Sequence, residues 1–241
     1  MTIRSLFTAG ALALAATVAV ATAVPASAST SFQGTPRVGP LFSPSRPDHH
    51  FCTASVVDSP NGNLLVTAAH CVVQAGSGRA RAGLTFAPGF HDGVRPYGTW
   101  AVSAVVADNR WLRHGDPAYD VAFLTVRPLR GAHGRIQDAV GGDRVAVDPA
   151  AGSRVTAVGY PTSRNRPVRC TARDRAFGAH QLRLDCPGLP GGTSGGPFLE
   201  GATIVGVIGG YQEGGATADV SYSSYFGPAI QAVYRAARRL R

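Results

Sequence analysis

The sequence contains no lysine, and all 23 of its basic residues are arginine. We attribute this to the coding bias of a GC-rich genome, because no physical role excludes every lysine. Charge of either sign is scarce: 15% of the 241 residues are charged and 44% are hydrophobic, which argues against a wholly disordered chain. The length is too great for a miniprotein held by disulfides alone and suits one large domain or two small ones.

Long apolar runs are absent beyond the N-terminal region, so no later segment reaches the ~20 residues that a transmembrane helix needs. The one long run, Leu6–Val24, follows Arg4 and precedes Ala-Ser-Ala at residues 26–28, a combination typical of a cleaved secretory signal peptide. A membrane anchor is the alternative, but the run is rich in Ala and Thr. We therefore predict a signal peptide over residues 1–28 and a secreted, extracellular protein that leaves the membrane after cleavage.

The chain has only four cysteines, and none of them shows the Cys-x-x-Cys spacing of a zinc site. An even number in a secreted protein predicts two disulfides, for which three pairings are possible. Pairing of sequence neighbours would join Cys52 to Cys71 and Cys170 to Cys186, each bond adding ~3 kcal/mol on a chain-entropy model. No spacing of histidines suggests a metal site either, so we predict no metal and no other cofactor.

Helical periodicity is almost absent, whereas 30 glycines and 17 prolines separate short runs of β-forming residues. About six such runs fall in each half, which predicts two antiparallel barrels or sandwiches, at residues 48–135 and 136–227. The polar, proline-rich stretch 29–47 is predicted to be an extended arm or a pro-segment. Only residues 228–241 have an apolar stripe at helical spacing, with Pro228 in the first turn.

The predicted helix ends in a group of arginines, which complement the helix dipole there: Arg235, Arg238, Arg239 and Arg241. We favour a solvated helix end over a nucleic-acid-binding tail. The formal net charge of +9 at pH 7 supports loose attraction to anionic polymers. The arginines are scattered, however, and aromatic residues are not interleaved with them, so we expect no specific nucleic-acid binding.

Three segments carry the residue types of a nucleophilic active site. Thr67–Cys71 places His70 directly after an apolar run, and Asp120 stands at the start of a strongly apolar strand. Gly191–Pro197 surrounds Ser194 with glycines, which leave the backbone free to turn its N–H groups inward beside an exposed hydroxyl. The His or the Asp alone would have a structural explanation. The Gly-x-Ser-Gly-Gly-Pro string is far more specific, and the order His, Asp, Ser makes coincidence remote.

With these motifs the sequence resembles the secreted trypsin/chymotrypsin-like serine proteases of the compact bacterial kind. The resemblance extends from about Val38 to the C-terminal helix. It implies an all-β fold of two antiparallel six-stranded β-barrels, with the active site between them and a C-terminal α-helix. It also implies the disulfide between Cys52 and Cys71 beside the histidine, in agreement with the pairing of neighbours.

The resemblance further implies how the residues act. Ser194 would attack the scissile carbonyl while neutral His70 takes its proton, and Asp120 would hold the tautomer of His70. The N–H groups of Gly192 and Ser194 would form the oxyanion hole, where one donor is typically worth ~3–4 kcal/mol in the transition state. We therefore expect a monomeric serine endopeptidase that forms an acyl-enzyme with protein or peptide substrates.

Two departures from the animal digestive proteases stand out. Thr193 replaces the Asp that pairs with a new N-terminus in those enzymes after zymogen cleavage. The sequence Arg37-Val38-Gly39 nevertheless resembles a processing site, and cleavage there would free Val38.

Substrate selection is predicted by counting back from the nucleophile, which puts the floor of the specificity pocket near Gly188. The strand that pairs with substrate should be Ile208-Gly209-Gly210-Tyr211. No carboxylate lies in residues 186–190, which argues against Arg/Lys specificity. The strand also lacks the histidine that glutamate-selective relatives carry. Tyr211 either narrows the pocket, favouring a small or medium apolar residue, or points to solvent.

Two rival functions remain. A catalytically inert member of the same fold, acting as a secreted binding protein, would have lost one of the three residues, and all three are present. An α/β-hydrolase esterase is disfavoured because the serine motif is not Gly-x-Ser-x-Gly and the order of the three residues differs.

Overall fold

The structure is a computed structural model, and the residues that it describes are Met1 and 28–240. The predicted signal peptide therefore lies almost wholly outside the described residues. No helix in the described part of the chain is both long and apolar enough to cross a membrane.

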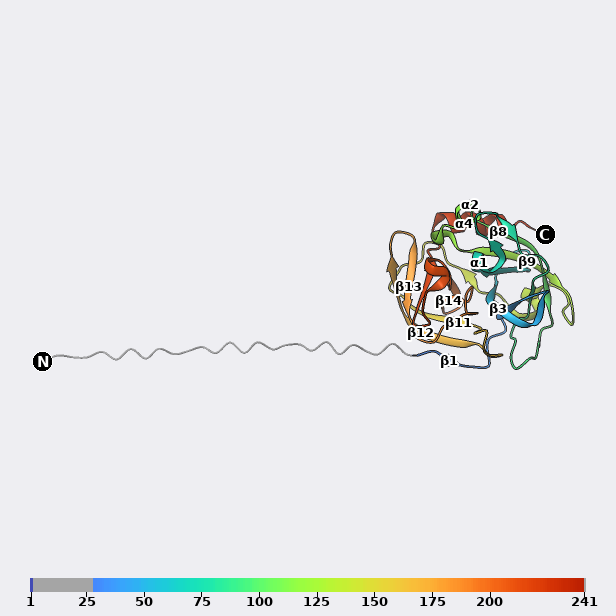
Figure 1. The fold of residues 1–241 in the computed structure, drawn as a ribbon, viewed down its shortest axis with the longest axis horizontal. Helices are drawn as coiled ribbons and strands as arrows, with labels where there is room; N and C mark the ends of the chain where they lie inside the picture. The colour runs from blue at the N-terminus through green and yellow to red at the C-terminus, as the bar shows by residue number, and fades with distance from the viewer. Residues whose placement is uncertain (2–27, 241) are drawn as a thin grey trace.

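The first half of the chain forms a closed six-stranded barrel, seen in blue to green in Figure 1. Each neighbouring pair is antiparallel. The strands follow the order β2 (Val38–Ser43), β3 (Arg46–Val57), β4 (Leu64–Thr67), β9 (Ala122–Pro128), β8 (Trp100–Ala107) and β7 (Thr85–Phe86). Because alternate side chains of a strand point to one face, the barrel closes over a shared core that contains Leu41, Phe86, Trp100 and Leu124, all fully buried.

The second half forms an eight-stranded sheet. Six of its strands are the antiparallel set β11 (Arg154–Gly159), β12 (Val168–Phe177), β13 (Gln181–Asp185), β14 (Pro197–Glu200), β15 (Thr203–Val207) and β16 (Val220–Ser224). Two short edge strands are added: β10 (Arg144–Val145), parallel to β15, and β1 (Thr30–Ser31), antiparallel to β12. The predicted all-β class is confirmed.

The hydrogen-bonded path of this second sheet is open, but β16, at one end of it, also bonds to β15 and to the residues that follow β15. The Val207 N–H donates to Ser223 Oγ at 2.9 Å, and the Gly209 N–H donates to the carbonyl oxygen of Tyr222 at 2.9 Å. These two bonds curl the sheet back on itself, as the prediction of a second barrel requires, although β15 and β16 form no strand ladder.

The predicted C-terminal helix is α4 (Pro228–Ala237), at the top of Figure 1. It begins at Pro228, whose missing N–H costs nothing in the first turn. Its buried face is Ile230, Val233 and Ala237, and this face packs against both halves, on residues that include Val57, Phe123 and Ile204. The helix therefore acts as a clamp between the barrel and the sheet, while Arg235, Arg238 and Arg239 stay exposed.

Several short elements have too few residues to show a periodic pattern, so the sequence analysis did not predict them. The helices are α1 (Ala69–Val72), α2 (Asn109–His114) and α3 (Ile136–Val140), with single 3-10 turns η1 (Pro117–Tyr119) and η2 (Tyr211–Gly214). A two-stranded ribbon pairs β5 (Val73–Gln74) with β6 (Arg79–Ala80).

The prediction of an arm over residues 29–47 needs correction, because Val38–Ser43 is the barrel strand β2. Gly39 and Pro40 hide this strand in the sequence, because both residue types weaken strand propensity. Gly39 is required there, since a Cβ would collide with the backbone of Ala87. The Arg37–Val38 bond also lies within the barrel: Val38 is fully buried, and the Arg37 carbonyl accepts the Val56 N–H at 2.8 Å. The Arg37–Val38 bond therefore does not lie in an exposed loop of the kind that processing proteases cut.

The clamp role of α4 can be measured. Ile230→Ala should lower the free energy of unfolding by about 2–5 kcal/mol, because it leaves a cavity between the two halves. Arg235→Ala on the exposed face of the same helix should change it by less than about 0.5 kcal/mol. Urea unfolding of both variants tests this, and equal effects of the two substitutions would contradict it.

Candidate active site

His70 is held at the junction between β4 and the short helix α1. The four residues of β4 and the next two alanines, Ala68 and Ala69, are all fully buried, so the chain enters α1 from inside the barrel. The disulfide between Cys52 and Cys71 fastens α1 to β3 immediately after His70. The imidazole is thus anchored on both sides and keeps 12% of its surface exposed.

Asp120 follows η1 and is completely buried. Its Oδ1 accepts the His70 N–H at 2.8 Å, and its Oδ2 lies 2.7 Å from His70 Nδ1. Oδ2 also accepts the Gly210 N–H, at 2.9 Å, from the second half of the chain. Three N–H groups therefore compensate the buried carboxylate. The donor from the second half is a backbone N–H, that of Gly210, because the neighbouring Gly209 has no side-chain hydroxyl that could donate to Asp120.

These contacts determine the protonation of His70. Burial disfavours the charged imidazole, but the charge of Asp120 and its hydrogen bond to Nδ1 outweigh burial and raise the pKa of His70 above its ordinary 6.5. The carboxylate of Glu213 acts in the same direction. Because Asp120 holds the proton on Nδ1, the other ring nitrogen is left to accept a proton in the neutral form.

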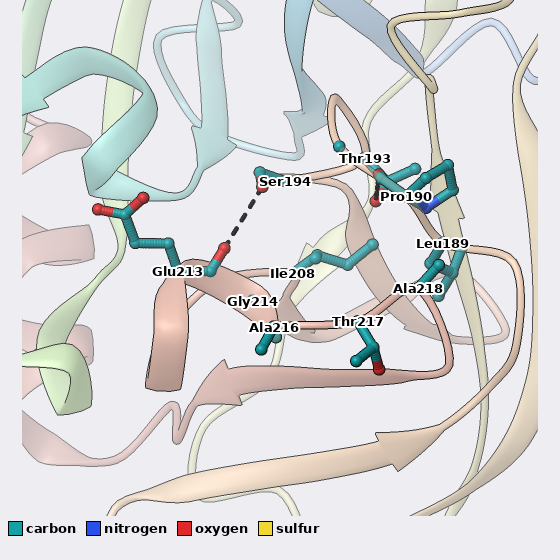
Figure 2. Close-up of a pocket in the computed structure, with 12 residues that line it drawn as sticks. Leu189, Pro190, Thr193, Ser194, Ile208, Glu213, Gly214, Ala216, Thr217 and Ala218 are labelled. Atoms are coloured by element: carbon teal, nitrogen blue, oxygen red, sulfur yellow. Dashed lines mark hydrogen bonds between the residues drawn. The ribbon is translucent and has the colours of Figure 1, made fainter.

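Ser194 lies on the loop between β13 and β14. Its carbonyl accepts the Thr53 N–H at 2.8 Å and lies 3.7 Å from Cys71 Sγ, so the loop sits against the residue that follows His70. Figure 2 shows its hydroxyl donating to the carbonyl oxygen of Glu213 at 3.4 Å. Within the described residues no hydrogen bond joins Ser194 to His70.

The backbone around Ser194 has two free donors. In the part of the chain that the structure describes, neither the Gly192 N–H nor the Ser194 N–H has a protein acceptor. Gly192 has φ +96°, and a Cβ there would lie 2.5 Å from the Thr162 nitrogen, so no other residue fits without displacing this neighbour. The two predicted oxyanion donors are therefore available to a ligand beside Ser194.

A cavity of about 210 Å³ opens next to Ser194 (Figure 2). Leu189 and Pro190 form one wall, and Ile208 and Ala218 contribute to the others. Glu213 is the one charged residue at its edge, and in Figure 2 its carboxylate is turned away from the wall at Leu189 and Ala218. The cavity can hold a small or medium uncharged side chain beside the hydroxyl.

Residues 52–207 match the family model described as the trypsin-like peptidase domain. The chain belongs to this family.

Solved structures of similar fold agree with this assignment. The protease Anisep from Arthrobacter nicotinovorans is 25% identical with a TM-score of 0.77, over 88% of this chain and 100% of that one. The thermostable serine protease AL20 from an extremophilic microorganism is 26% identical with a TM-score of 0.75, over 86% and 99%. A Glu endopeptidase, 18% identical with a TM-score of 0.72 over 88% and 97%, shares the fold. No curated protein sequence matches the chain significantly.

Within this peptidase domain, the four residues predicted to bind substrate border the cavity without lining it. Gly209 and Gly210 lie against Asp120. Tyr211 packs on the rings of Phe177 and Tyr222, 5.3 and 5.1 Å away between centroids. Of the predicted substrate strand only Ile208 lines the cavity, together with residues of the 189–194 loop and with residues 213–218, which the sequence analysis missed. Their only signal was the pair of glycines at 214 and 215.

Gly188 is covered by the N-terminal segment. The Ser29 hydroxyl donates to the Gly188 carbonyl at 2.6 Å, and the Ser29 N–H donates to the Pro187 carbonyl at 2.7 Å. Gly188 has φ +92°, and a Cβ would overlap the Ser29 hydroxyl. Gly188, predicted as the pocket floor, is therefore occupied by Ser29, the residue before β1, and lies next to the wall residue Leu189.

Both disulfides formed by neighbouring cysteines are present, Cys52–Cys71 and Cys170–Cys186. The second joins β12 to the segment that leads to the cavity wall. Among the described residues, one grouping of possible metal ligands brings Cys52, His70 and Cys71 within 4.8 Å of one another. Its two sulfurs are bonded to each other, so it offers no thiolate to a metal ion.

The influence of Asp120 on His70 can be tested by NMR titration. The His70 imidazole should titrate with a midpoint above 6.5, and Asp120→Asn should bring it below 6.5, since burial then acts unopposed by the carboxylate. Asp138→Asn removes an exposed carboxylate that pairs with Arg135 and should leave the midpoint unchanged. An unchanged midpoint in Asp120→Asn would show that the carboxylate does not determine the charge of His70.

Proposed function

We propose that this protein is a secreted serine endopeptidase that hydrolyses peptide bonds through His70, Asp120 and Ser194. The observation that carries the proposal is the fully buried Asp120 carboxylate, bonded to both the backbone and Nδ1 of His70, with Ser194 fastened beside the same helix. The two unpaired donors at Gly192 and Ser194, next to an uncharged cavity, complete the parts that acyl transfer needs.

In the first half of the reaction, the Ser194 hydroxyl leaves its long 3.4 Å bond to Glu213 and donates its proton to the free ring nitrogen of His70. Its oxygen attacks the scissile carbonyl, and the N–H groups of Gly192 and Ser194 bind the resulting oxyanion. The imidazolium, stabilised by Asp120, then protonates the leaving amine. The bond to the amine breaks and the acyl-enzyme remains.

In the second half, His70 accepts a proton from water, and the hydroxide formed attacks the acyl carbonyl. The same donors bind the second oxyanion. Return of the proton from His70 to Ser194 releases the acid product and restores the enzyme. Neither half of this route uses a metal or an organic cofactor.

The cavity beside Ser194 supports a preference for a small or medium uncharged residue before the scissile bond. Its walls at Leu189, Ile208 and Ala218 are apolar, and none carries a carboxylate to receive Arg or Lys. They also lack a cationic or histidine side chain that would select Glu. Because Tyr211 packs on other aromatic rings, we assign the selection to these walls rather than to Tyr211.

Secretion and a monomeric state belong to the same proposal. Two disulfides fit an oxidising compartment outside the cell. The arginines at the end of α4 are exposed, as a solvated helix end requires, and we expect no specific nucleic-acid partner. A catalytically inert binding protein is the alternative, and the complete set of His70, Asp120 and Ser194 weighs against it.

Labelling with a fluorophosphonate probe tests the nucleophile directly. The chain from Ser29, folded with both disulfides, should form one adduct, mapped to Ser194 by mass spectrometry. His70→Ala should lower the labelling rate about 10⁴-fold or more, because nucleophile and base act as a unit. The rate should rise as the pH increases through the His70 pKa, above 6.5, since only the neutral imidazole accepts the proton.

The control is Ser45→Ala, which removes an exposed serine hydroxyl outside the site and should leave Ser194 labelled. Absence of any adduct on the folded chain would favour the inert binding protein. A peptide-library digest with the labelling-competent protein then tests the preference for small or medium uncharged residues.

A further inference from the structure

Thr53 makes four hydrogen bonds at the boundary between the two halves of the molecule. It lies on β3 next to Cys52 and is fully buried. Its hydroxyl donates to the Gly192 carbonyl at 3.0 Å and accepts the Tyr160 N–H at 2.8 Å. Its own N–H donates to the Ser194 carbonyl at 2.8 Å, and its carbonyl accepts the Thr67 hydroxyl at 2.7 Å.

These four bonds join the loop that carries Ser194, the end of β11 and the strand that leads to His70. Gly192 and Ser194 belong to the loop at residues 191–197, here called the nucleophile loop. Tyr160 follows β11 of the second half, and Thr67 ends the strand that leads to His70. One residue of the barrel is therefore connected to the nucleophile loop, by its hydroxyl and its N–H, and through its carbonyl and β4 to the segment that carries the base.

The nucleophile loop needs such an external restraint because glycines give it conformational freedom. The second half holds its two ends: Thr162 donates to the Gly191 carbonyl at 2.9 Å, and the Gly195 N–H donates to Ile208 at 2.6 Å. Thr193 bonds within the loop, its hydroxyl donating to the Pro190 carbonyl at 2.7 Å, and it carries no charge that could anchor the loop by an ion pair.

Between these ends, the two free donors belong to the Gly191–Gly192 and Thr193–Ser194 peptides, and the Gly192–Thr193 peptide links them. The Thr53 hydroxyl donates to the carbonyl of this linking peptide, that of Gly192, and the Thr53 N–H donates to the Ser194 carbonyl that follows the second donor. Since the Gly192 carbonyl is buried among protein atoms, loss of the hydroxyl would leave it without a partner. The loop would then be free to turn the Gly192 N–H away from the substrate.

We propose that Thr53 is a positioning residue for the proposed peptidase reaction, whose hydroxyl holds the Gly192–Thr193 peptide between the two oxyanion donors so that both donors face the substrate. The inference rests on the proposed function for its catalytic consequence. The restraint itself is a property of the loop and can be measured without activity.

The kinetic test uses three variants. Thr53→Val keeps the shape of the side chain and removes the hydroxyl, and it should lower kcat about 10- to 100-fold with little change in KM. Thr53→Ser keeps the hydroxyl and should return kcat to within a few-fold of the wild type. The matched control is Thr125→Val, which removes a buried hydroxyl bonded to Ser103 on the barrel and should leave kcat unchanged.

Amide hydrogen exchange supplies the second readout. In Thr53→Val, the Thr193, Gly195 and Gly196 amides should exchange faster, while Thr53→Ser and Thr125→Val should match the wild type. This readout decides the restraint even if the wild type forms no adduct with the fluorophosphonate, an outcome that would refute the peptidase proposal alone. The inference is overturned if amide exchange in Thr53→Val is unchanged or if Thr125→Val has the same effects as Thr53→Val. It is also overturned if Thr53→Ser fails to restore kcat and amide exchange to near the wild-type values.

Discussion

The buried carboxylate of Asp120 is the group on which the arrangement of this molecule depends. A carboxylate without water costs several kcal/mol unless it is fully hydrogen-bonded, so its three N–H donors are a condition of folding as well as of chemistry. Two donors come from His70 and the third from Gly210 of the second half. The same charge that orients the imidazole therefore draws the second sheet onto the barrel.

Packing around the site keeps this polar centre in place. The cluster that includes Val57, Phe123 and Ile204 runs continuously from barrel to sheet beneath α4. On the other side, Val38 and Phe42 of β2 pack against Val158 and Tyr160. Because apolar contact closes the boundary between the halves on both sides, the hydrogen bonds of the site lie in a rigid frame and hold their geometry.

The sequence was most informative where function demands unusual local composition. The glycines around Ser194, the small residues before His70 and the apolar strand after Asp120 each produce a pattern within a few residues. The helix from Pro228, a regular element with a plain pattern, was also predicted well.

Features made by distant contacts left no such pattern. Thr53 lies 139 residues from its partner Gly192, and nothing in its neighbours reveals the bond. The strand Val38–Ser43 was hidden because Gly39 and Pro40, which weaken strand propensity, are present for packing and not for a turn. Gly188 was predicted as a pocket floor from its spacing to Ser194, yet a segment 159 residues earlier in the sequence covers it.

The contact between Ser29 and the loop at Pro187 and Gly188 bears on how the protein should be produced. If the signal peptide is cleaved at the predicted site, the nitrogen that donates to Pro187 is a free terminal ammonium. An amino-terminal affinity tag replaces that ammonium with a peptide bond. The tag then extends from Ser29 past the wall of the cavity beside Ser194. Purification through a carboxy-terminal tag avoids this contact and preserves the natural start of the chain.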